Sequence, residues 1–448
     1  MSGLTSAATN EMNIWQPIAV LLTVALAISL RFSPKLRGYQ FTAWIIAAVT
    51  AAMIYPATFL HVGDFDLRNK WLILIVVQTV MFGMGTQMSL HDFTGIVKAP
   101  RGVLVGIVCH FSVMPLVGLA LTKIFHFEPE IAAGIILIGS CSSGLASNVM
   151  AYIAKSNLVL SVTVTAITTM VAPLMTPLLM KLLAGTMVEV KFFNMMMEII
   201  KIVLVPIGAA LIHDYLKISE NKVDSYFAPV VVTDSAPSSH PSPPVGEKVS
   251  AGRMRGNVCG AVGRTIIFLL AAFGAAWLAF LALGGWNYFK ANVSPDALVA
   301  LGIFDFLLSA VVIGVVYHWL TRWFTRLDSW MPVASMAGIV YFTTVTTAAG
   351  RDNLLKVGAL LFLAAALHNA AGYGFGYWLS RAAGLDKNSA RSVAFEVGLQ
   401  NGGMASGLAG AMGKLGTVGL AAAIFSPWMN VSGSVLANYW KKKPVKAD

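Results

Sequence analysis

The sequence predicts an all-α, multi-pass membrane protein, and three observations support this prediction. Hydrophobic residues make up 57% of the 448-residue chain and charged residues only 11%, whereas soluble domains carry about a quarter charged residues. The mean hydropathy is +0.74. Apolar runs of about 20 residues recur along the chain, and each is long enough to cross the roughly 30 Å hydrocarbon core as a helix.

The apolar runs predict about thirteen spans. The first is expected to be a retained helix, because the residues before it lack the basic n-region of a cleaved signal peptide. In order, the spans lie near 14–31, 41–60, 71–90, 102–122, 130–154, 158–184, 192–213, 264–284, 297–320, 330–349, 355–381, 390–413 and 416–440. Residues 219–263 are rich in proline, serine and glycine and lack apolar periodicity, which predicts a flexible cytoplasmic linker.

The basic residues predict an orientation. A formal net charge of +11 is expected of a membrane protein with basic cytoplasmic loops, so it does not call for a nucleic-acid partner. If the tail from Lys441 is cytoplasmic, the loops on that side hold about 21 basic residues, against about 9 on the opposite side. We therefore expect a protein of the plasma or inner membrane, with its N-terminus outside and its C-terminus in the cytoplasm.

Two apolar spans are interrupted by small and polar residues. The stretches are GSCSSGLASNVMAYIAKSN at 139–157 and FEVGLQNGGMASGLAGAMGK at 395–414, and both contain a G-x-A-S core. Broken helices at corresponding positions in two halves of a chain indicate the binding site of a secondary transporter. Unwound carbonyl groups suit sodium, and half-helix N-termini favour an anion. Close helix packing through small residues is the simpler alternative.

Glu396 is the sharpest single feature of the second stretch. A carboxylate at membrane depth is costly and marks a functional site by default. The alternative is a structural glutamate paired with a basic residue such as Arg391. On the helix predicted at 158–184, Ser161 and Thr165 share one face and present two hydroxyls to one neighbour.

Other polar residues in the spans are interpreted as structural. Glu198 and Lys201 are three residues apart and can pair on one helix face. His110 and His368 are each expected to be hydrogen-bonded core residues more often than ligands.

Together these motifs resemble the bile acid:sodium symporter family, including its bacterial members. The similar stretches are GLASNVMAYIAKSNLVLSVTVTAITTMVAPLMTPLLMKLLAG, RSVAFEVGLQNGGMASGLA and FSPWMNVSGSVLANYW, at 144–185, 391–409 and 425–440. The resemblance implies a core of ten helices in two inverted five-helix repeats, with a panel domain against a core domain in which two broken helices cross. About three further helices, near 14–31, 264–284 and 297–320, are additions to this core.

The resemblance also implies site residues. A first sodium ion is expected at Ser147, Asn148, Ser161, Thr165 and Glu396. A second is expected at Glu396, Gln400 and the backbone carbonyls of Val397 and Leu399, joined by His110, which stands where the family has a glutamine. The substrate cavity is expected beside them, at Leu145, Asn401, Met429 and Asn430.

The implied organisation follows the chain. It comprises 1–35 as an extra helix, 36–218 as the first repeat and the start of the second, 219–263 as the linker, 264–328 as an inserted helix pair, 329–440 as the rest of the second repeat and 441–448 as a basic tail.

The predicted function is sodium-coupled symport of an organic anion across the bilayer by alternating access. The anion is expected to be a carboxylate or sulfonate, either bile-acid-like or a small metabolite. Proton coupling or antiport through His110 and Glu396 is one alternative, and a membrane sensor that has lost transport is another. No nucleophile–base set or nucleotide-binding loop suggests an enzyme, nothing resembles the repeated filter of a channel, and no feature predicts an oligomeric state.

Overall fold

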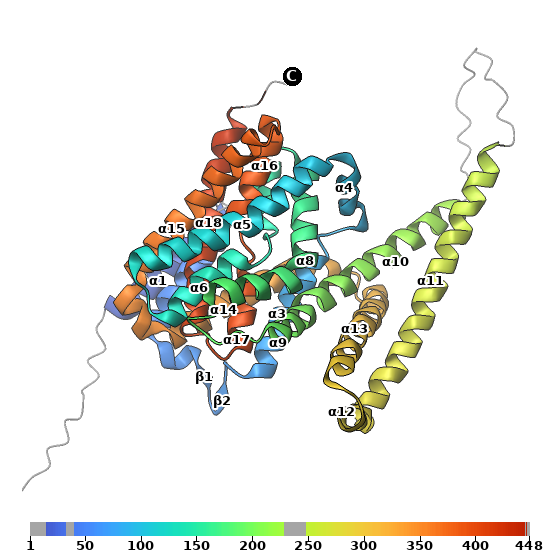
Figure 1. Cartoon of the computed structure of the whole chain (residues 1–448), viewed down its shortest axis with the longest axis horizontal. Helices are drawn as coiled ribbons and strands as arrows, with labels where there is room; N and C mark the ends of the chain where they lie inside the picture. The colour runs from blue at the N-terminus through green and yellow to red at the C-terminus, as the bar shows by residue number, and fades with distance from the viewer. Residues whose placement is uncertain (1–14, 33–39, 228–247, 444, 446–448) are drawn as a thin grey trace, which may run out of the picture. The chain divides into compact units, whose positions relative to one another are not determined.

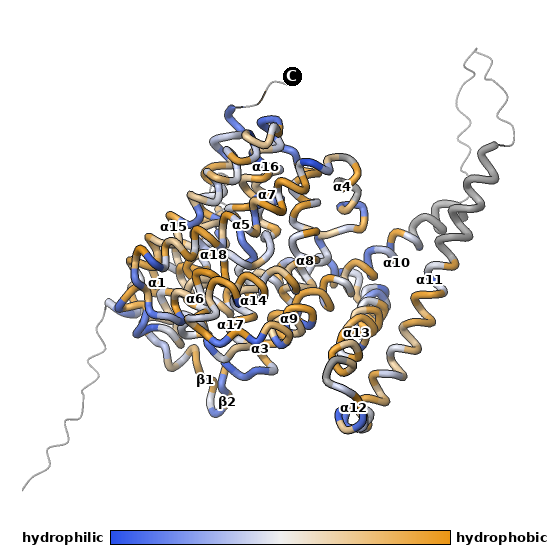
Figure 2. The backbone as a smooth tube through the Cα atoms, in the orientation of Figure 1, coloured by the Kyte–Doolittle hydropathy of each residue, from blue (hydrophilic) through white to orange (hydrophobic). Residues whose placement is uncertain are grey.

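The computed structural model describes residues 15–32, 40–227, 248–443 and 445, and almost all of them are helical (Figure 1). Within these ranges, nine helical segments are long and apolar enough to cross a membrane. Hydrophobic residues run along them, and hydrophilic ones gather mainly at turns and ends (Figure 2). The chain is an all-α, multi-pass membrane protein, as its composition predicts.

The described helices follow one another with short connections. The first half contains α1 (Trp15–Ser29), α2 (Gln40–Ile54), α3 (Lys70–Gly85), α4 (Gly95–Lys98), α5 (Pro100–Phe125), α6 (Pro129–Ser140), α7 (Ala146–Ile153), α8 (Leu158–Ala184), α9 (Phe192–Ile199) and α10 (Val205–Phe227). The second half contains α11 (Lys248–Phe280), α12 (Trp286–Asn292), α13 (Pro295–Trp323), α14 (Leu327–Ala349), α15 (Arg351–Ala382), α16 (Lys387–Gly398), α17 (Gly402–Ala411) and α18 (Val418–Lys441).

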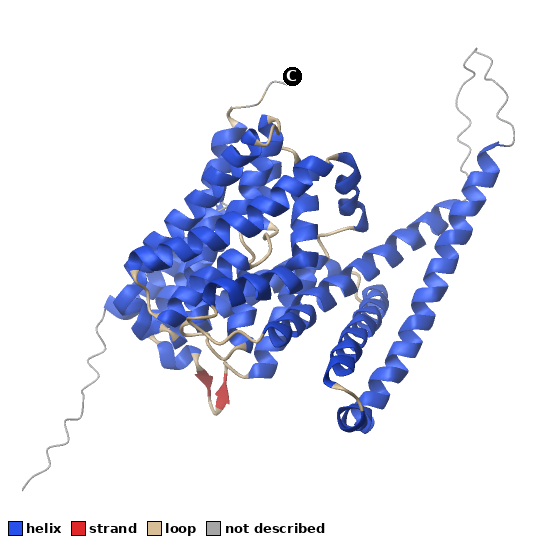
Figure 3. Ribbon diagram, viewed as in Figure 1, coloured by secondary structure: helices blue, strands red, loops and turns tan. Residues whose placement is uncertain are grey.

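Short irregular helices and one hairpin complete the described chain. The 3₁₀ turns are η1 (Leu30–Phe32), η3 (Pro56–Phe59) and η4 (Leu90–Thr94), and the π-helical turns are η5 (Ile200–Leu204) and η6 (Leu281–Gly285). Strands β1 (His61–Val62) and β2 (Phe65–Asp66) pair antiparallel around Gly63, whose φ of 59° suits a residue without a Cβ. They are the strands drawn in Figure 3, and every longer element is a helix.

Each predicted span coincides with a helix or with a broken pair of helices. The two interrupted spans are broken where the small and polar residues lie: α6 ends at Ser140 before α7, and α16 ends at Gly398 before α17.

Helix extends into both ends of the segment 219–263, where the sequence predicts a linker. The helix α10 continues to Phe227, and α11 already begins at Lys248. Adding residues to an existing helix is far easier than starting one. Polar residues that adjoin an apolar span and include no proline can therefore extend its helix. The proline-rich middle of the predicted linker, 228–247, lies outside the described residues, as do 1–14, 33–39, 444 and 446–448.

The chain divides into two compact units. The first consists of Met1–Val80, Gly95–Met196 and Met336–Asp448, and the second of Met81–Thr94 and Met197–Ser335. In the first unit, α5 packs against α6, α8, α15 and α16, while α18 packs against α6, α15 and α17. In the second unit, α13 packs along both α10 and α11.

Candidate functional site

The two helix breaks meet in the first unit and are joined through their backbones. Ser143 and Gln400 form an antiparallel bridge. The Gly144 amide donates to the Leu399 carbonyl over 3.0 Å, and the Asn401 amide donates to the Ser142 carbonyl over 2.8 Å. Unwound backbone at membrane depth is tolerated only where its polar groups find partners or line a cavity. Each break therefore supplies hydrogen-bond partners for some backbone groups of the other.

Gly144 allows this close approach. A Cβ built on Gly144 would lie 2.8 Å from the carbonyl oxygen of Gln400, a backbone atom that cannot rotate away. Any larger residue would push the two breaks apart, so the first G-x-A-S motif supplies a glycine where the segments touch.

Side chains from neighbouring helices cap the carbonyls that the breaks leave without helical partners. Thr176 donates to the Ser140 carbonyl over 2.7 Å, and Asn369 donates to the Gly398 carbonyl over 2.8 Å. Within the second break, the Gln400 amide donates to the Val397 carbonyl over 2.7 Å. The ends of α6 and α16 are thereby held in place.

The Glu396 carboxylate is fully buried beside the crossing and is surrounded by side-chain oxygens. Thr165 donates to its Oε2 over 2.7 Å, and Ser161 donates to its Oε1. Asn148 Oδ1 lies 3.0 Å from the Ser161 hydroxyl and 3.1 Å from the Thr165 hydroxyl. Ser147 Oγ lies 3.2 Å from Thr165 Oγ1. The five residues expected at the first sodium site are thus brought together from α7, α8 and α16.

This cluster has more acceptor oxygens than hydrogens to share. A serine or threonine hydroxyl carries one hydrogen, yet Ser161 and Thr165 each lie within hydrogen-bonding distance of both Glu396 and Asn148. Ser147 also uses its hydrogen on the Gly144 carbonyl, 2.8 Å away. An oxygen-only set with one carboxylate is the donor chemistry that suits a hard cation such as sodium.

Pairing with Arg391 does not account for Glu396. Arg391 donates to the Lys443 carbonyl over 2.9 Å and lies over the Trp440 ring, 5.4 Å from its centroid. No ion pair involves Glu396 within the described parts of the chain. The buried carboxylate is therefore left without a cation from those parts.

The residues expected at the second sodium site are also close together, but their oxygens are more fully engaged. His110 Nδ1 lies 2.9 Å from the Glu396 carbonyl oxygen, and Nε2 lies 2.8 Å from the Cys141 carbonyl oxygen. The Leu399 carbonyl accepts from Gly144, and the Val397 carbonyl accepts from Gln400. Gln400 Oε1 is buried without a hydrogen-bond partner in the described chain, so one oxygen of this set remains available.

The expected substrate residues lie in different surroundings. Asn401 is buried at the break, where its Oδ1 caps the Met404 amide and its Nδ2 donates to Ser142 Oγ over 3.4 Å. Leu145 directly precedes α7 and is partly buried. On α18, Asn430 donates to the carbonyl of Ser426 on its own helix over 2.9 Å, and Met429 is buried.

The remaining polar residues of the spans are placed as interpreted from the sequence. Lys201 and Glu198 form an i,i+3 ion pair at 3.3 Å. His368 is buried and bonds the Met114 carbonyl through Nε2 over 2.8 Å.

Several residues that hold the site were not singled out from the sequence. Asn369 and Thr176 cap helix ends, as described above. Ser143 bonds the Leu399 carbonyl through Oγ over 3.3 Å, and Ser432 donates to Asn369 Oδ1 over 2.5 Å. The only sequence signal for these residues is an amide or hydroxyl side chain within an apolar run. Such side chains often hydrogen-bond the backbone of their own helix, so the signal does not single out a site.

Comparison with known proteins identifies the class. The Sodium Bile acid symporter family matches residues 74–236. An uncharacterized sodium-dependent transporter of Bacillus subtilis is 29% identical over 410 residues, which cover 91% of this chain and 93% of that protein. A probable chloroplastic sodium/metabolite cotransporter of Arabidopsis thaliana is 26% identical over 407 residues, covering 91% of this chain and 74% of the relative. The human ileal sodium/bile acid cotransporter is 38% identical over 107 residues, or 24% of this chain and 31% of its own length.

Residues 74–236 are thus similar to the sodium bile acid symporter family. Over most of its length the chain is similar to proteins named as sodium-dependent or sodium/metabolite transporters.

Proposed function

We propose that the protein is a symporter that couples sodium to uptake of an organic anion by alternating access. The observation that carries the proposal is the Glu396 carboxylate, fully buried, surrounded by hydroxyl and amide oxygens and without a basic partner in the described chain. Burying an isolated carboxylate is strongly unfavourable. A transported sodium ion would supply the missing positive charge.

The residues present fit one sodium ion well and a second in part. Ser147, Asn148, Ser161, Thr165 and Glu396 would hold the first ion through side-chain oxygens alone. For the second, Gln400 Oε1 is free, whereas the carbonyls of Val397 and Leu399 and that of Glu396 already have hydrogen-bonding neighbours. His110 would have to release the Glu396 carbonyl before that carbonyl could face an ion.

The substrate proposal is a small carboxylate or sulfonate near Asn401 and Asn430, with Leu145 and Met429 as apolar neighbours. Its support is the start of α17 at Gly402, since the partial positive charge of a helix N-terminus attracts an anion. A Cβ on Gly402 would meet Ser426 Oγ of α18 at 1.8 Å, so α18 directly contacts this helix start. The relatives named for bile acid and metabolite cotransport suggest the same class of ligand.

The proposal includes an organisation and an orientation. The family core would comprise 36–218 and 329–440, with 1–35 and 264–328 as additional helices, and the charge asymmetry would place the tail from Lys441 in the cytoplasm of the cell. Reporter fusions to the C-terminus test the orientation. A reporter active only outside the cytoplasm would overturn it.

The test of sodium coupling is thermal stabilisation of the purified full-length protein in sodium compared with potassium and choline, followed by uptake of labelled carboxylates and sulfonates into proteoliposomes. We expect sodium alone to raise the melting temperature and to drive uptake. Absence of any sodium response between about pH 5 and about pH 8, where histidine ionisation changes, would overturn sodium coupling. Ligand binding without flux would indicate a sensor rather than a transporter.

A second candidate, proton coupling, is favoured by the surroundings of His110. Both ring nitrogens face carbonyl oxygens, at 2.9 and 2.8 Å, and only a doubly protonated imidazole can donate to both. Under this candidate a pH gradient drives uptake in sodium-free buffer. His110→Gln would then abolish proton-driven uptake, whereas under sodium coupling it restores the glutamine of the family and preserves sodium-driven uptake.

A further inference from the structure

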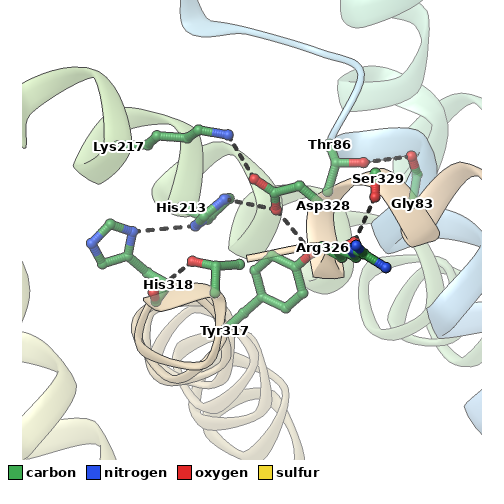
Figure 4. Close-up of polar contacts among 10 residues, drawn as sticks. Gly83, Thr86, His213, Lys217, Tyr317, His318, Arg326, Asp328 and Ser329 are labelled. Carbon is green, nitrogen blue, oxygen red and sulfur yellow. Dashed lines mark hydrogen bonds and ion pairs between the residues drawn. The ribbon is translucent and has the colours of Figure 1, made fainter. Parts of the chain in front are cut away.

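Four titratable side chains form a chain of contacts in the second unit. His213 Nε2 lies 3.2 Å from Asp328 Oδ1 (Figure 4). At the other end, His318 Nε2 lies 3.2 Å from Glu220 Oε1. Between them, the Nδ1 atoms of the two histidines lie 3.3 Å apart. The order is therefore carboxylate, imidazole, imidazole, carboxylate, contributed by α10, α13 and the start of α14.

Each carboxylate of this chain already has a basic partner. Lys217 Nζ lies 2.6 Å from Asp328 Oδ2, and Arg322 pairs with Glu220. Tyr317 adds a hydrogen bond to Asp328 Oδ1 over 3.0 Å. Both carboxylates are consequently held ionised at the ends of the chain, where they can only accept hydrogens.

The histidine pair itself is buried and packed. His213 is 4% exposed and His318 is 3% exposed, so water does not solvate the contact between their rings. The Tyr317 ring meets the His213 ring edge to face, with centroids 4.9 Å apart. The two imidazoles must therefore satisfy each other.

Counting hydrogens fixes the protonation state that this geometry suits. Each Nε2 lies 3.2 Å from an oxygen of an ionised carboxylate without forming an aligned hydrogen bond, and this neighbouring negative charge favours a hydrogen on each Nε2. The Nδ1–Nδ1 contact needs one hydrogen, with one nitrogen donating and the other accepting. The two rings thus hold three hydrogens together, which is one imidazolium and one neutral imidazole sharing a proton.

We propose that His213 and His318 form a proton-binding site that couples pH to the packing of α13 against α10 and α14. With one shared proton, the two rings are joined by a hydrogen bond between their Nδ1 atoms, and the positive charge lies between two carboxylates. Loss of that proton leaves two lone pairs facing each other, and a second proton places two N–H groups against each other. Either change removes the hydrogen bond between α10 and α13 and leaves buried polar groups unpaired, which is destabilising.

Charged groups surround the histidine pair from each element packed against it. On α10 they are Lys217, Glu220 and Asp214, whose Oδ2 is buried without a hydrogen-bond partner in the described chain. Arg322 on α13 and Asp328 on α14 complete the two ends. From α11, Arg264 reaches the Ser219 carbonyl rather than either histidine. Histidine is the residue type in this cluster whose ordinary pKa lies closest to neutral pH.

The first experiment measures thermal unfolding of the full-length protein in potassium buffer between about pH 5 and about pH 9, a range that spans histidine titration. Potassium leaves the proposed sodium site out of the measurement. We expect a stability maximum with a fall on both sides, since one proton of difference changes the unfolding equilibrium up to about tenfold per pH unit. His213→Gln and His318→Gln each remove the titrating pair, so both should flatten the profile.

The matched control is His61→Gln, which removes an exposed histidine on β1 and should keep the wild-type profile. Profiles of His213→Gln and His318→Gln that parallel the wild type would overturn the proposal. Failure here leaves the sodium response untouched, and failure of the sodium response leaves this profile untouched.

A second measurement on the wild-type protein does not depend on how the variants fold. In nitrogen NMR with ¹⁵N-labelled histidine, His213 and His318 should show one charged and one neutral ring near pH 7. A hydrogen-bond coupling should connect their two Nδ1 atoms. Two neutral rings or two charged rings at that pH would contradict the shared proton.

Discussion

Two carboxylate clusters of this protein compensate their charge in different ways. In the first unit, Glu396 contacts hydroxyl and amide oxygens and forms no ion pair within the described parts of the chain. In the second unit, Asp328 and Glu220 contact Lys217 and Arg322 as well as the histidines. One cluster carries its own cations, and the other does not.

The difference indicates which cluster needs a positive charge from outside the described parts of the chain. Buried charge is tolerated when it is paired, so the paired cluster is complete once a proton is shared. In the Glu396 cluster, several oxygen lone pairs and one negative charge are directed at one position. This arrangement is expected of a site that binds a cation reversibly. The following variants test whether the two clusters behave in these two ways.

The largest effect is expected from Glu396→Gln, which removes the charge but keeps the size of the side chain. Losing one partner of a buried charge pair costs about 3–5 kcal/mol, so sodium affinity should fall by about a hundredfold or more. Sodium-dependent melting shifts measure this loss. As a control, Glu198→Gln removes a carboxylate that pairs with Lys201 on one helix and should keep the sodium response. A sodium response retained in Glu396→Gln would place the cation elsewhere.

The next largest effect is expected at the contact between the two breaks. Gly144→Ala places a Cβ 2.8 Å from the Gln400 carbonyl oxygen, and overpacking of this kind costs about 1–3 kcal/mol. The melting temperature should fall even without sodium, and sodium affinity should fall with it, because Ser147 and Asn148 follow directly on α7. Gly374→Ala is the matched control, since its Cβ would meet nothing within 4 Å. Equal melting temperatures for the two variants would contradict the close contact between the two breaks.

The two clusters also differ in how far the sequence could predict them. The breaks were predictable because glycine, serine and amide residues interrupt apolar runs in both halves, and the shared face of Ser161 and Thr165 follows from helical spacing. Their meeting with Glu396 was expected only through the family resemblance.

Helical spacing alone could not give the second cluster. His213 and His318 are 105 residues apart in sequence, and their contact depends on how α13 packs along α10. The same holds for Asn369, whose cap on the Gly398 carbonyl joins α15 to the end of α16. Such pairings depend on tertiary packing rather than on any local pattern.

A smaller effect is expected when one neutral ligand of the proposed sodium site is removed. Thr165→Val keeps the shape of the side chain but loses the hydroxyl that contacts Glu396, Asn148 and Ser147. Loss of one such hydrogen-bonding group is worth about 1 kcal/mol, or up to about 3 kcal/mol when charge is involved, so sodium affinity should fall roughly tenfold. Thr122→Val is the control, because the buried Thr122 hydroxyl bonds only its own helix at Leu119 in the described chain. Equal sodium affinities in the two variants would remove Thr165 from the site.

The smallest effect on sodium is expected from a change in the cluster that carries its own cations. Tyr317→Phe keeps the ring that packs edge to face on His213 and Phe82 but removes the hydroxyl that donates to Asp328 Oδ1. Asp328 retains Lys217 and His213, so the loss should be about 0.5–1.5 kcal/mol of stability, seen as a small fall in melting temperature at neutral pH. Tyr288→Phe, which alters a tyrosine that is 63% exposed, is the control and should melt like the wild type. Sodium affinity should be the same in both variants. A change in sodium affinity in Tyr317→Phe alone would mean that the two clusters are coupled. The Glu396 cluster and the Asp328 cluster could then no longer be treated as independent.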